Sequence, residues 1–213
     1  MIAVLGTVAC IAGVLVVTAY ELTLPRIKEN RRMAMAQAID ALYPTAATRR
    51  AYVVTPEGLA ATNEFLPAGQ VAYAVFDADN RFLGIAAEAA ARGYQDVIQL
   101  LYAYSPQCQC ITAIHVLRNN DTPGIGDRIS RDRAFRQNFV ALDVRLAPDR
   151  RQLANAIATV KHGSKTEAWQ IDAISGATVT SKAVGRALHD SAQTVVPRVA
   201  AELKRISQAG DAP

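Results

Sequence analysis

Val71-Ala-Tyr-Ala-Val-Phe76, Asp77-Ala-Asp-Asn80 and Arg81-Phe-Leu-Gly-Ile-Ala86 follow one another and decide the fold class. Two apolar runs joined by a short stretch of Asp and Asn predict a β-hairpin, because these residues favour tight turns. A second pair of runs, 96–104 and 111–117, is separated by a turn that contains Pro106. Hairpins in series with helices at both ends indicate an α+β domain and not a doubly wound fold.

Helical patterns lie on both sides of these hairpins. The segment 26–43 has apolar residues at helical spacing and is followed by Pro44, which ends a helix. Further along, we expect short helices at 128–138 and 150–162, a strand at 169–174 and a helix at 182–206 with a kink or break at Pro197. The segment 150–162 is predicted to be helical because Leu153, Ala156, Ile157 and Val160 would share one face.

The N-terminal segment Met1–Tyr20 contains no charged side chain. As a helix it would be roughly 30 Å long, which matches the hydrocarbon core of a bilayer. It lacks the basic start and the small-x-small cleavage pattern of a signal peptide, so we expect a retained anchor in the lipid bilayer. The predicted organisation is an anchor at 1–20, a linker helix at 21–44, a domain at 45–207 and a tail at 208–213.

Flanking charge makes its own prediction about orientation. Arg26, Lys28, Arg31 and Arg32 follow the span, and the positive-inside rule would keep these residues and the domain in the cytoplasm. The span itself carries no Asp, Glu, Lys, Arg or His, so any path for ions must lie in other proteins.

Composition argues against several classes of function. The net charge of +4 is spread among acidic residues and forms no basic stripe, which argues against nucleic-acid binding. The three cysteines and three histidines lack the spacing of a metal site. Cys108 and Cys110 lie in a turn, where they either form a bridge or pack as ordinary small residues; the second interpretation is the more common one.

The segment Ile171-Asp-Ala-Ile-Ser-Gly-Ala-Thr-Val-Thr-Ser-Lys182 carries the chemistry. It predicts a strand that passes through a turn into the N-terminus of a helix, where free N–H groups and the helix dipole favour a phosphate. Gly176 and Ala177 leave room for a ligand, Thr180 and Ser181 can cap the helix, and Lys182 adds a positive charge. The alternative is an N-cap turn that binds nothing.

A second candidate segment is Asn119-Asn-Asp-Thr-Pro-Gly-Ile-Gly126. Pro123 fixes one backbone dihedral, and Gly124 and Gly126 allow conformations that other residues avoid. Such a loop can approach a ligand closely, or it can be a plain surface turn.

Asp172, Ser175, Gly176, Ala177 and Thr178 match the signature D-x-x-[S/T]-G-A-T of FMN-binding domains. Average residue frequencies put a chance match at on the order of two per million windows. The order of the span, Leu42-Tyr43-Pro44, Ala91-Arg-Gly-Tyr94 and Thr122-Pro-Gly-Ile-Gly126 also resembles the G subunits of Rnf-type ion-translocating oxidoreductases, which are related to the C subunits of Na⁺-translocating NADH:quinone reductases. Two departures are a longer segment at 147–168 and the unusual Cys108-Gln-Cys110 turn.

The resemblance implies a covalent cofactor. FMN would be joined to the Thr178 hydroxyl through a phosphoester, placed there by an ApbE-type flavin transferase that uses FAD and magnesium and releases AMP. Asp172 would serve recognition or local charge, and Ser175 would support the turn. The backbone of Thr122, Pro123, Gly124, Ile125 and Gly126 would lie against the flavin.

The resemblance also implies a role in a larger assembly. The chain would be an anchored subunit that relays electrons within a complex coupling NADH/ferredoxin electron transfer to ion translocation, with no complete active site of its own. It would lie in the bacterial inner membrane with its domain on the extracytoplasmic side, against the prediction from flanking charge. Alternatives are an anchored flavin sensor or maturation protein, and a scaffold without flavin.

Overall fold

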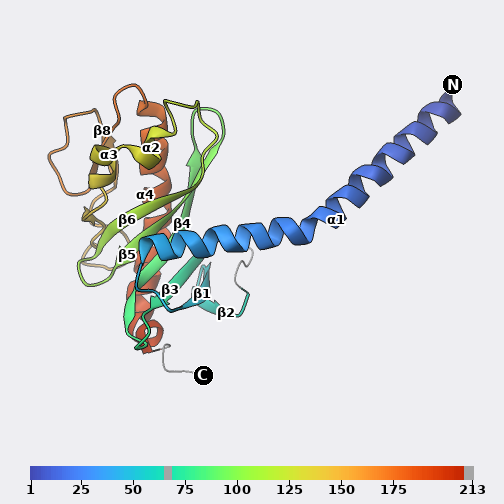
Figure 1. Ribbon diagram of the computed structural model, residues 1–213. Coiled ribbons are helices and arrows are strands. Elements are labelled where there is room, and N and C mark those ends of the chain that lie inside the picture. The colour runs from blue at the N-terminus through green and yellow to red at the C-terminus, as the bar shows by residue number, and fades with distance from the viewer. Residues whose placement is uncertain (65–68, 209–213) are drawn as a thin grey trace. The chain divides into compact units, whose positions relative to one another are not determined.

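The computed structural model describes residues 1–64 and 69–208 (Figure 1). The chain separates into one unit at residues 1–37 and a second unit at 38–213. Apart from residue 208, the predicted tail at 208–213 lies outside the described residues.

The first unit consists of most of one long helix. Helix α1, Ile2–Leu42, runs without interruption through Pro25, where the sequence led us to expect a span and a separate linker helix. A proline removes only one backbone donor, and the turns on both sides remain helical here. Among the described residues, α1 is the one helix long and apolar enough to span a membrane. The side chains of its apolar window are exposed, as expected for a segment whose surroundings are lipid.

An antiparallel sheet is the centre of the second unit. Its seven strands lie in the order β2-β1-β3-β4-β5-β6-β7. Their bounds are β1 Thr48–Thr55, β2 Gly58–Thr62, β3 Val71–Phe76, β4 Phe82–Arg92, β5 Val97–Ser105, β6 Cys110–Arg118 and β7 Leu142–Asp143. The two predicted hairpins are confirmed as β3–β4 and β5–β6. The first hairpin turns because the Asp77 carboxylate accepts from the N–H groups of Asp79 and Arg81 and Asn80 adopts a positive φ of 58°.

The end of α1 belongs to this unit and is fixed to the sheet. Ala38 and Ile39 are fully buried. The Tyr43 hydroxyl donates to the carbonyl of Ile85 at 3.0 Å. Burial of this phenol raises its pKa far above the ordinary value, so the hydroxyl keeps its proton and its role as donor.

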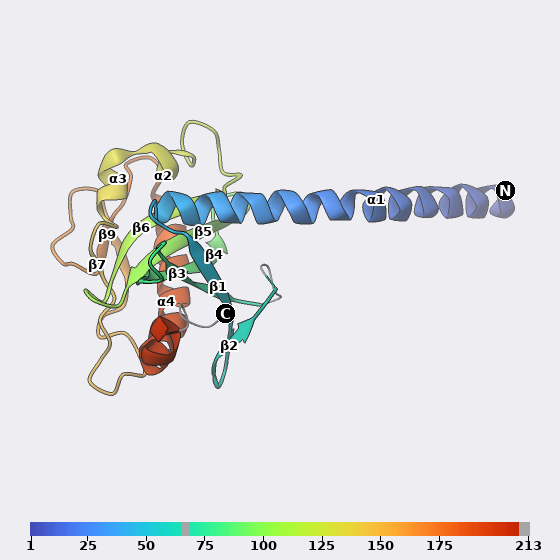
Figure 2. The same cartoon turned by 60° about the horizontal axis from the view of Figure 1, so that its bottom comes forward.

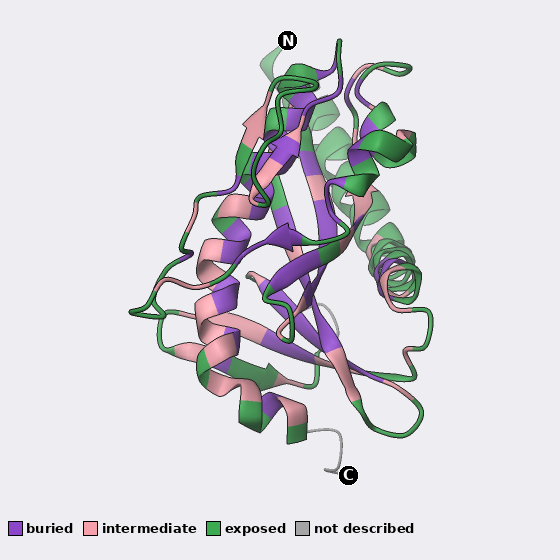
Figure 3. Cartoon of the chain, turned by 90° about the vertical axis from the view of Figure 1, so that its left-hand side faces the viewer, coloured by how far each residue is buried: buried purple, intermediate pink, exposed green. Residues whose placement is uncertain are grey.

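Helix α4, Thr178–Gln208, covers one face of the sheet (Figures 1 and 2). Its buried residues recur at helical spacing, and they lie along the side of the helix that is next to the sheet (Figure 3). The helix begins four residues before the predicted start at 182, and it does not break at Pro197. Its second half is fixed to the end of β1, where Arg198 Nε donates to the carbonyl of Thr55 at 2.7 Å.

The segment between β6 and α4 has little regular structure. Helices α2, Arg128–Arg131, and α3, Arg133–Gln137, confirm the helical prediction for 128–138 as two short pieces. They are separated at Asp132, whose carboxylate caps α3 by accepting from the N–H of Phe135 at 3.0 Å.

The predicted helix at 150–162 is wrong. The segment contains instead β8, Ala158–Val160, which pairs in parallel with β9, Gln170–Asp172. Leu153 and Ile157 are both buried. Their spacing of four residues resembles that of a helix, but here they are two points at which an extended segment packs into the core. Arg150 has a positive φ of 57°, which no helix interior allows.

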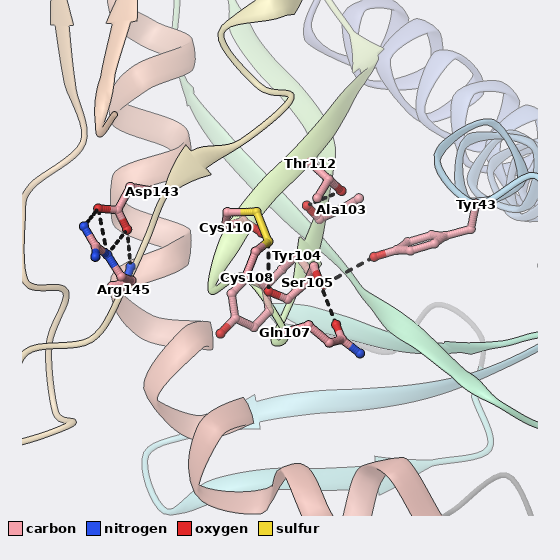
Figure 4. The surroundings of a disulfide bond; sticks show 10 residues. All are labelled: Tyr43, Ala103, Tyr104, Ser105, Gln107, Cys108, Cys110, Thr112, Asp143 and Arg145. Atoms are coloured by element: carbon pink, nitrogen blue, oxygen red, sulfur yellow. Dashed lines mark hydrogen bonds and ion pairs between the residues drawn. A yellow bond between two sulfur atoms is a disulfide. The ribbon is translucent and has the colours of Figure 1, made fainter. Parts of the chain in front are cut away.

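The interpretation of Cys108 and Cys110 as ordinary packed residues is also wrong. The two sulfur atoms form a disulfide at the tip of the β5–β6 hairpin (Figure 4).

Candidate functional site

The turn between β9 and α4 is fixed by a buried hydroxyl. Ser181 Oγ accepts from the N–H of Ile174 at 3.1 Å and donates to the carbonyl of Ala177 at 2.9 Å. Gly176 adopts a positive φ of 82°, which a residue with a side chain adopts only at a cost. Ser181 therefore joins the two ends of the turn from inside the first helical turn, and it does not act as an N-cap.

Thr178 is the first residue of α4 and is exposed. The first intrahelical bond near it runs from the N–H of Ser181 to the carbonyl of Ala177. The N–H groups of Thr178, Val179 and Thr180 precede this bond, and such groups have no partner within a helix. The Thr178 hydroxyl thus stands at the positive end of a long helix, beside donors that suit an anion.

The predicted loop 119–126 lies beside this helix end, and Asp121 connects the two. Its carboxylate accepts from the Thr180 hydroxyl at 2.7 Å and from the N–H groups of Gln95 at 2.9 Å and Tyr94 at 3.3 Å. Burial by itself would raise the pKa of this carboxyl. The hydrogen bonds from Gln95, Thr180 and Tyr94 together outweigh burial and hold the pKa below its ordinary value.

The two glycines of the loop serve different purposes. A Cβ at Gly126 would overlap the Cβ of Asp121, so this glycine permits close packing inside the loop. A Cβ at Gly124 would meet no atom of the described residues within 4 Å, but φ there is +79°. Gly124 therefore allows the positive φ that the loop requires, and Gly126 allows Asp121 to pack closely against the backbone.

A cavity of about 370 Å³ opens between the loop and the start of α4. Its walls are formed by Tyr94, Asp121, Thr122, Ile125, Gly126, Gly176, Ala177, Thr178, Val179 and Thr180. The structure thus brings the two segments predicted from the sequence into one site. Tyr94, Asp121 and Val179 were not predicted as site residues, although Tyr94 stood in one of the segments that carried the resemblance.

Five predicted residues do not line the cavity. Pro123 and Gly124 lie in the loop on its exposed side, and Lys182 is exposed on α4. Ser175 is exposed too, and its carbonyl accepts from Arg128 Nη1 at 3.0 Å. Arg128 thereby joins α2 to the turn that carries Thr178, and no local pattern in the sequence marks it.

Asp172, the fifth of these residues, braces a neighbouring turn. Its carboxylate accepts from the N–H of Gly163 at 2.9 Å, and its own N–H donates to Asn138 Oδ1 at 2.9 Å. It lines a separate hollow of about 570 Å³ together with Asn138 and Lys165. Burial lowers the pKa of Lys165, and the nearby Asp172 carboxylate opposes that shift.

Residues 93–193, which include both the loop and the strand–turn–helix junction, match the model of the FMN-binding domain family. The match covers 101 of the 213 residues, and over these residues the chain is similar to FMN-binding domains.

Two curated relatives support the same assignment. The chain is 32% identical over 116 residues to the G subunit of the proton-translocating ferredoxin:NAD(+) oxidoreductase complex of Clostridium ljungdahlii, covering 54% of this chain and 55% of the relative. It is 34% identical over 123 residues to the G subunit of the ion-translocating oxidoreductase complex of Methanosarcina acetivorans, covering 58% and 57%. The aligned part is thus little more than half of each relative, and the resemblance to G subunits is confirmed over that part.

Solved structures show that the fold is shared. NqrC of Shewanella oneidensis covers 84% of this chain and is itself covered over 99% of its length, with a TM-score of 0.62 and 14% identity. The C subunit of the Na(+)-translocating NADH-quinone reductase from Parabacteroides distasonis covers 72% of this chain, which covers 78% of that protein, with a TM-score of 0.57 and 18% identity. The predicted α+β FMN-binding domain with antiparallel hairpins and flanking helices is confirmed.

Proposed function

We propose that FMN is attached to Thr178 through a phosphoester and that the chain relays electrons as a membrane-anchored subunit of an ion-translocating oxidoreductase complex. One observation carries the proposal. The exposed Thr178 hydroxyl lies at the N-terminus of α4 and in the wall of the cavity that the Thr122–Gly126 loop completes.

The residues present fit both parts of this cofactor. The first N–H groups of α4 suit a phosphoester at Thr178. The ring system would lie against apolar groups of Ile125, Val179 and Ala177 and against Tyr94, in a cavity of about 370 Å³. Ligand cavities commonly measure roughly 300–1,000 Å³ and combine apolar walls with a few polar groups. FMN would supply the redox chemistry, and the residues of this cavity would position the group.

Attachment requires a separate enzyme. An ApbE-type flavin transferase, acting with FAD and magnesium, would transfer FMN to Thr178 and release AMP. Thr178 is exposed and the turn before it is fixed by Ser181, so a folded chain presents the hydroxyl to that enzyme. Asp172 lies on β9, just before the turn, and we assign it a role in holding the segment that the transferase recognises.

The relatives support a larger role. Both G subunits that the chain resembles belong to ion-translocating complexes, so we infer partner subunits in the membrane and electron transfer between NADH and ferredoxin coupled to H⁺ or Na⁺ movement. The apolar part of α1 supplies the anchor and has no Asp, Glu, Lys, Arg or His in residues 1–20. We place the domain outside the cytoplasm of the bacterial inner membrane. The disulfide of the hairpin supports this placement, because disulfides persist in oxidising compartments.

Mass spectrometry of the protein purified from its native host tests the attachment. We expect the peptide that contains Trp169–Lys182 to gain the mass of one FMN less one water, located at Thr178. The variant Thr178→Ala should lack this mass, and Thr166→Ala, an exposed threonine outside the cavity, should retain it. An unmodified native peptide would refute covalent attachment, and copurification of multi-span proteins with the chain would test the complex separately.

A further inference from the structure

The Cys108–Cys110 disulfide lies at a hairpin tip, among residues that the flavin cavity does not use (Figure 4). Cys108 and Gln109 are exposed, whereas Cys110 is only 6% exposed. The residue that carries one sulfur is therefore open to another molecule, and the residue that carries the other is packed inside the protein.

The bond contributes little to the architecture. The hairpin is already closed by the pairing of β5 with β6, in which Ser105 lies opposite Cys110 and Tyr104 opposite Ile111. The stabilisation by a disulfide grows with the length of chain it closes, and this one has a sequence separation of 2. Its presence is therefore not explained by a need to hold distant parts of the chain together.

Contacts in the turn would also accommodate the reduced state, in which Cys108 and Cys110 are thiols. The carbonyl of Ser105 lies 3.7 Å from Cys108 Sγ, where it can accept from a thiol after the bond is broken. The carbonyl of Gln109 accepts from the N–H of Val144 at 3.1 Å, so the tip stays fixed to the strand beside it without the disulfide. Opposite Cys110, the Asp143 carboxylate is occupied by Arg145, with Nη2 to Oδ2 at 2.8 Å.

We propose that Cys108 and Cys110 form a thiol–disulfide exchange site that takes electrons from a dithiol protein. A thiolate of that protein attacks Cys108 Sγ, a mixed disulfide forms, and the bond to Cys110 breaks with its electron pair left on Cys110 Sγ, which takes up a proton. The second thiolate of the dithiol protein then attacks its own bonded sulfur and releases Cys108 as a thiol. Two electrons and two protons reach this chain, and the dithiol is oxidised to a disulfide.

The exposures of the two sulfurs assign their roles. Attack occurs in line with the bond being broken, so the exposed Cys108 is the sulfur that an approaching protein reaches. Cys110, in the first position of β6, is the leaving group. The opposite order would require a partner to reach a buried atom.

The first experiment compares reducibility with folding. The full-length flavinylated protein is prepared in detergent with Cys10→Ser, which removes the exposed free cysteine. It is equilibrated with reduced and oxidised dithiothreitol at defined ratios, alkylated and mapped by mass spectrometry. We expect both Cys108 and Cys110 to be alkylated at ratios that leave the circular dichroism spectrum and the thermal midpoint unchanged. Alkylation that occurs only together with unfolding would make the bond structural and overturn the proposal.

The second experiment tests the assignment of roles with oxidised glutathione as the probe. In the Cys10→Ser background, Cys110→Ser leaves the exposed thiol and Cys108→Ser leaves the buried one. We expect the first variant to form the mixed disulfide at least about tenfold faster, because reaction rates follow thiol access. Equal rates, or a faster reaction at Cys110, would contradict the assignment of Cys108 as the attacked sulfur. The flavin content of every sample is recorded separately, so a failure here is distinguishable from a failure of the flavin attachment.

Discussion

Asp121 is the residue that joins the two segments of the candidate site. Its buried carboxylate receives three hydrogen bonds, from Tyr94, Gln95 and Thr180. The variant Asp121→Asn places an amide donor among these donors, so we expect the free energy of unfolding to fall by about 1–3 kcal/mol at pH 7. Urea unfolding measures this change, and the exposed Asp79→Asn is the matched control, with little expected effect.

The same carboxylate predicts a dependence on pH. Its pKa in the folded protein is below the reference value of 3.8, so its contribution to stability is fully present above that value. The contribution is lost as pH falls through the lower folded pKa. The difference in stability between the native protein and Asp121→Asn should therefore shrink between pH 7 and pH 3. A constant difference over that range would show that the charge of Asp121 does not matter.

The glycines of the loop give a second prediction at this scale. Gly126→Ala forces its methyl group against Asp121 and should cost about 1–3 kcal/mol. Gly124→Ala has room for the methyl group but meets a positive φ, and it should cost about 1–2 kcal/mol. Restoring space with Asp121→Gly, which removes the Cβ that the new methyl group would meet, should reduce the effect of Gly126→Ala and leave that of Gly124→Ala unchanged. Equal responses in the two double variants would contradict the assignment of a packing role to Gly126.

Local patterns in the sequence predicted the motif and the loop but not the contact that joins them. The Gly-containing turn before α4 and the breaker residues of 119–126 are both visible in a short window of sequence. Asp121 meets Thr180 across 59 positions of chain, and Arg128 meets Ser175 across 47. Contacts of this kind follow from the packing of the sheet against α4, which no local pattern encodes.

At the scale of elements, β8 packs against α4 through one close approach. A Cβ at Gly185 would overlap Thr159 Oγ1, a buried atom with no hydrogen-bond partner among the described residues. Gly185→Ala should therefore destabilise the protein although alanine favours a helix. Adding Thr159→Ala should recover that loss and gain roughly 0.5–1 kcal/mol from helix propensity. Thermal unfolding of the native protein, the two single variants and the double variant measures the coupling between Gly185 and Thr159. Additive effects of the two substitutions would show that the two residues do not touch.

The elements that the sequence predicted well are those with strong local signals. Strands β3 and β5 are buried over nearly their whole length, and turn residues bound them on both sides. Strands β1 and β2 were not predicted, because β1 begins with Thr-Arg-Arg and shows no clean alternation. The segment 150–162 was predicted wrongly because two buried residues four positions apart mimic a helix when the chain between them is extended.

At the scale of the whole molecule, the division at residues 37 and 38 predicts an independent domain. A chain that begins at Ala38 keeps Ile39 and the Tyr43 hydrogen bond to Ile85. We expect it to be soluble without detergent and to unfold within a few degrees of the full chain, because a domain with its own core folds alone. Aggregation, or a much lower midpoint, would show that the first unit is needed for folding.

The proposed orientation is tested in cells. If the domain lies outside the cytoplasm, protease added to intact spheroplasts should digest it, and protease added to inverted membrane vesicles should leave it whole. The basic residues at 26–32 predict the opposite pattern. Digestion in inverted vesicles alone would therefore place the domain in the cytoplasm and remove the disulfide as support for export.

The hydroxyl of Ser181 has a consequence for the order of events in assembly. It closes the turn before Thr178 with bonds to Ile174 and Ala177, and these bonds involve no atom of a cofactor. The turn before Thr178 therefore has its conformation before any cofactor is attached. Under the proposed attachment, a newly made chain would stay folded until flavin is supplied, and a misfolded chain would not present the Thr178 hydroxyl in that conformation. The supply of cofactor would then control how many finished chains become active, without changing how many chains fold.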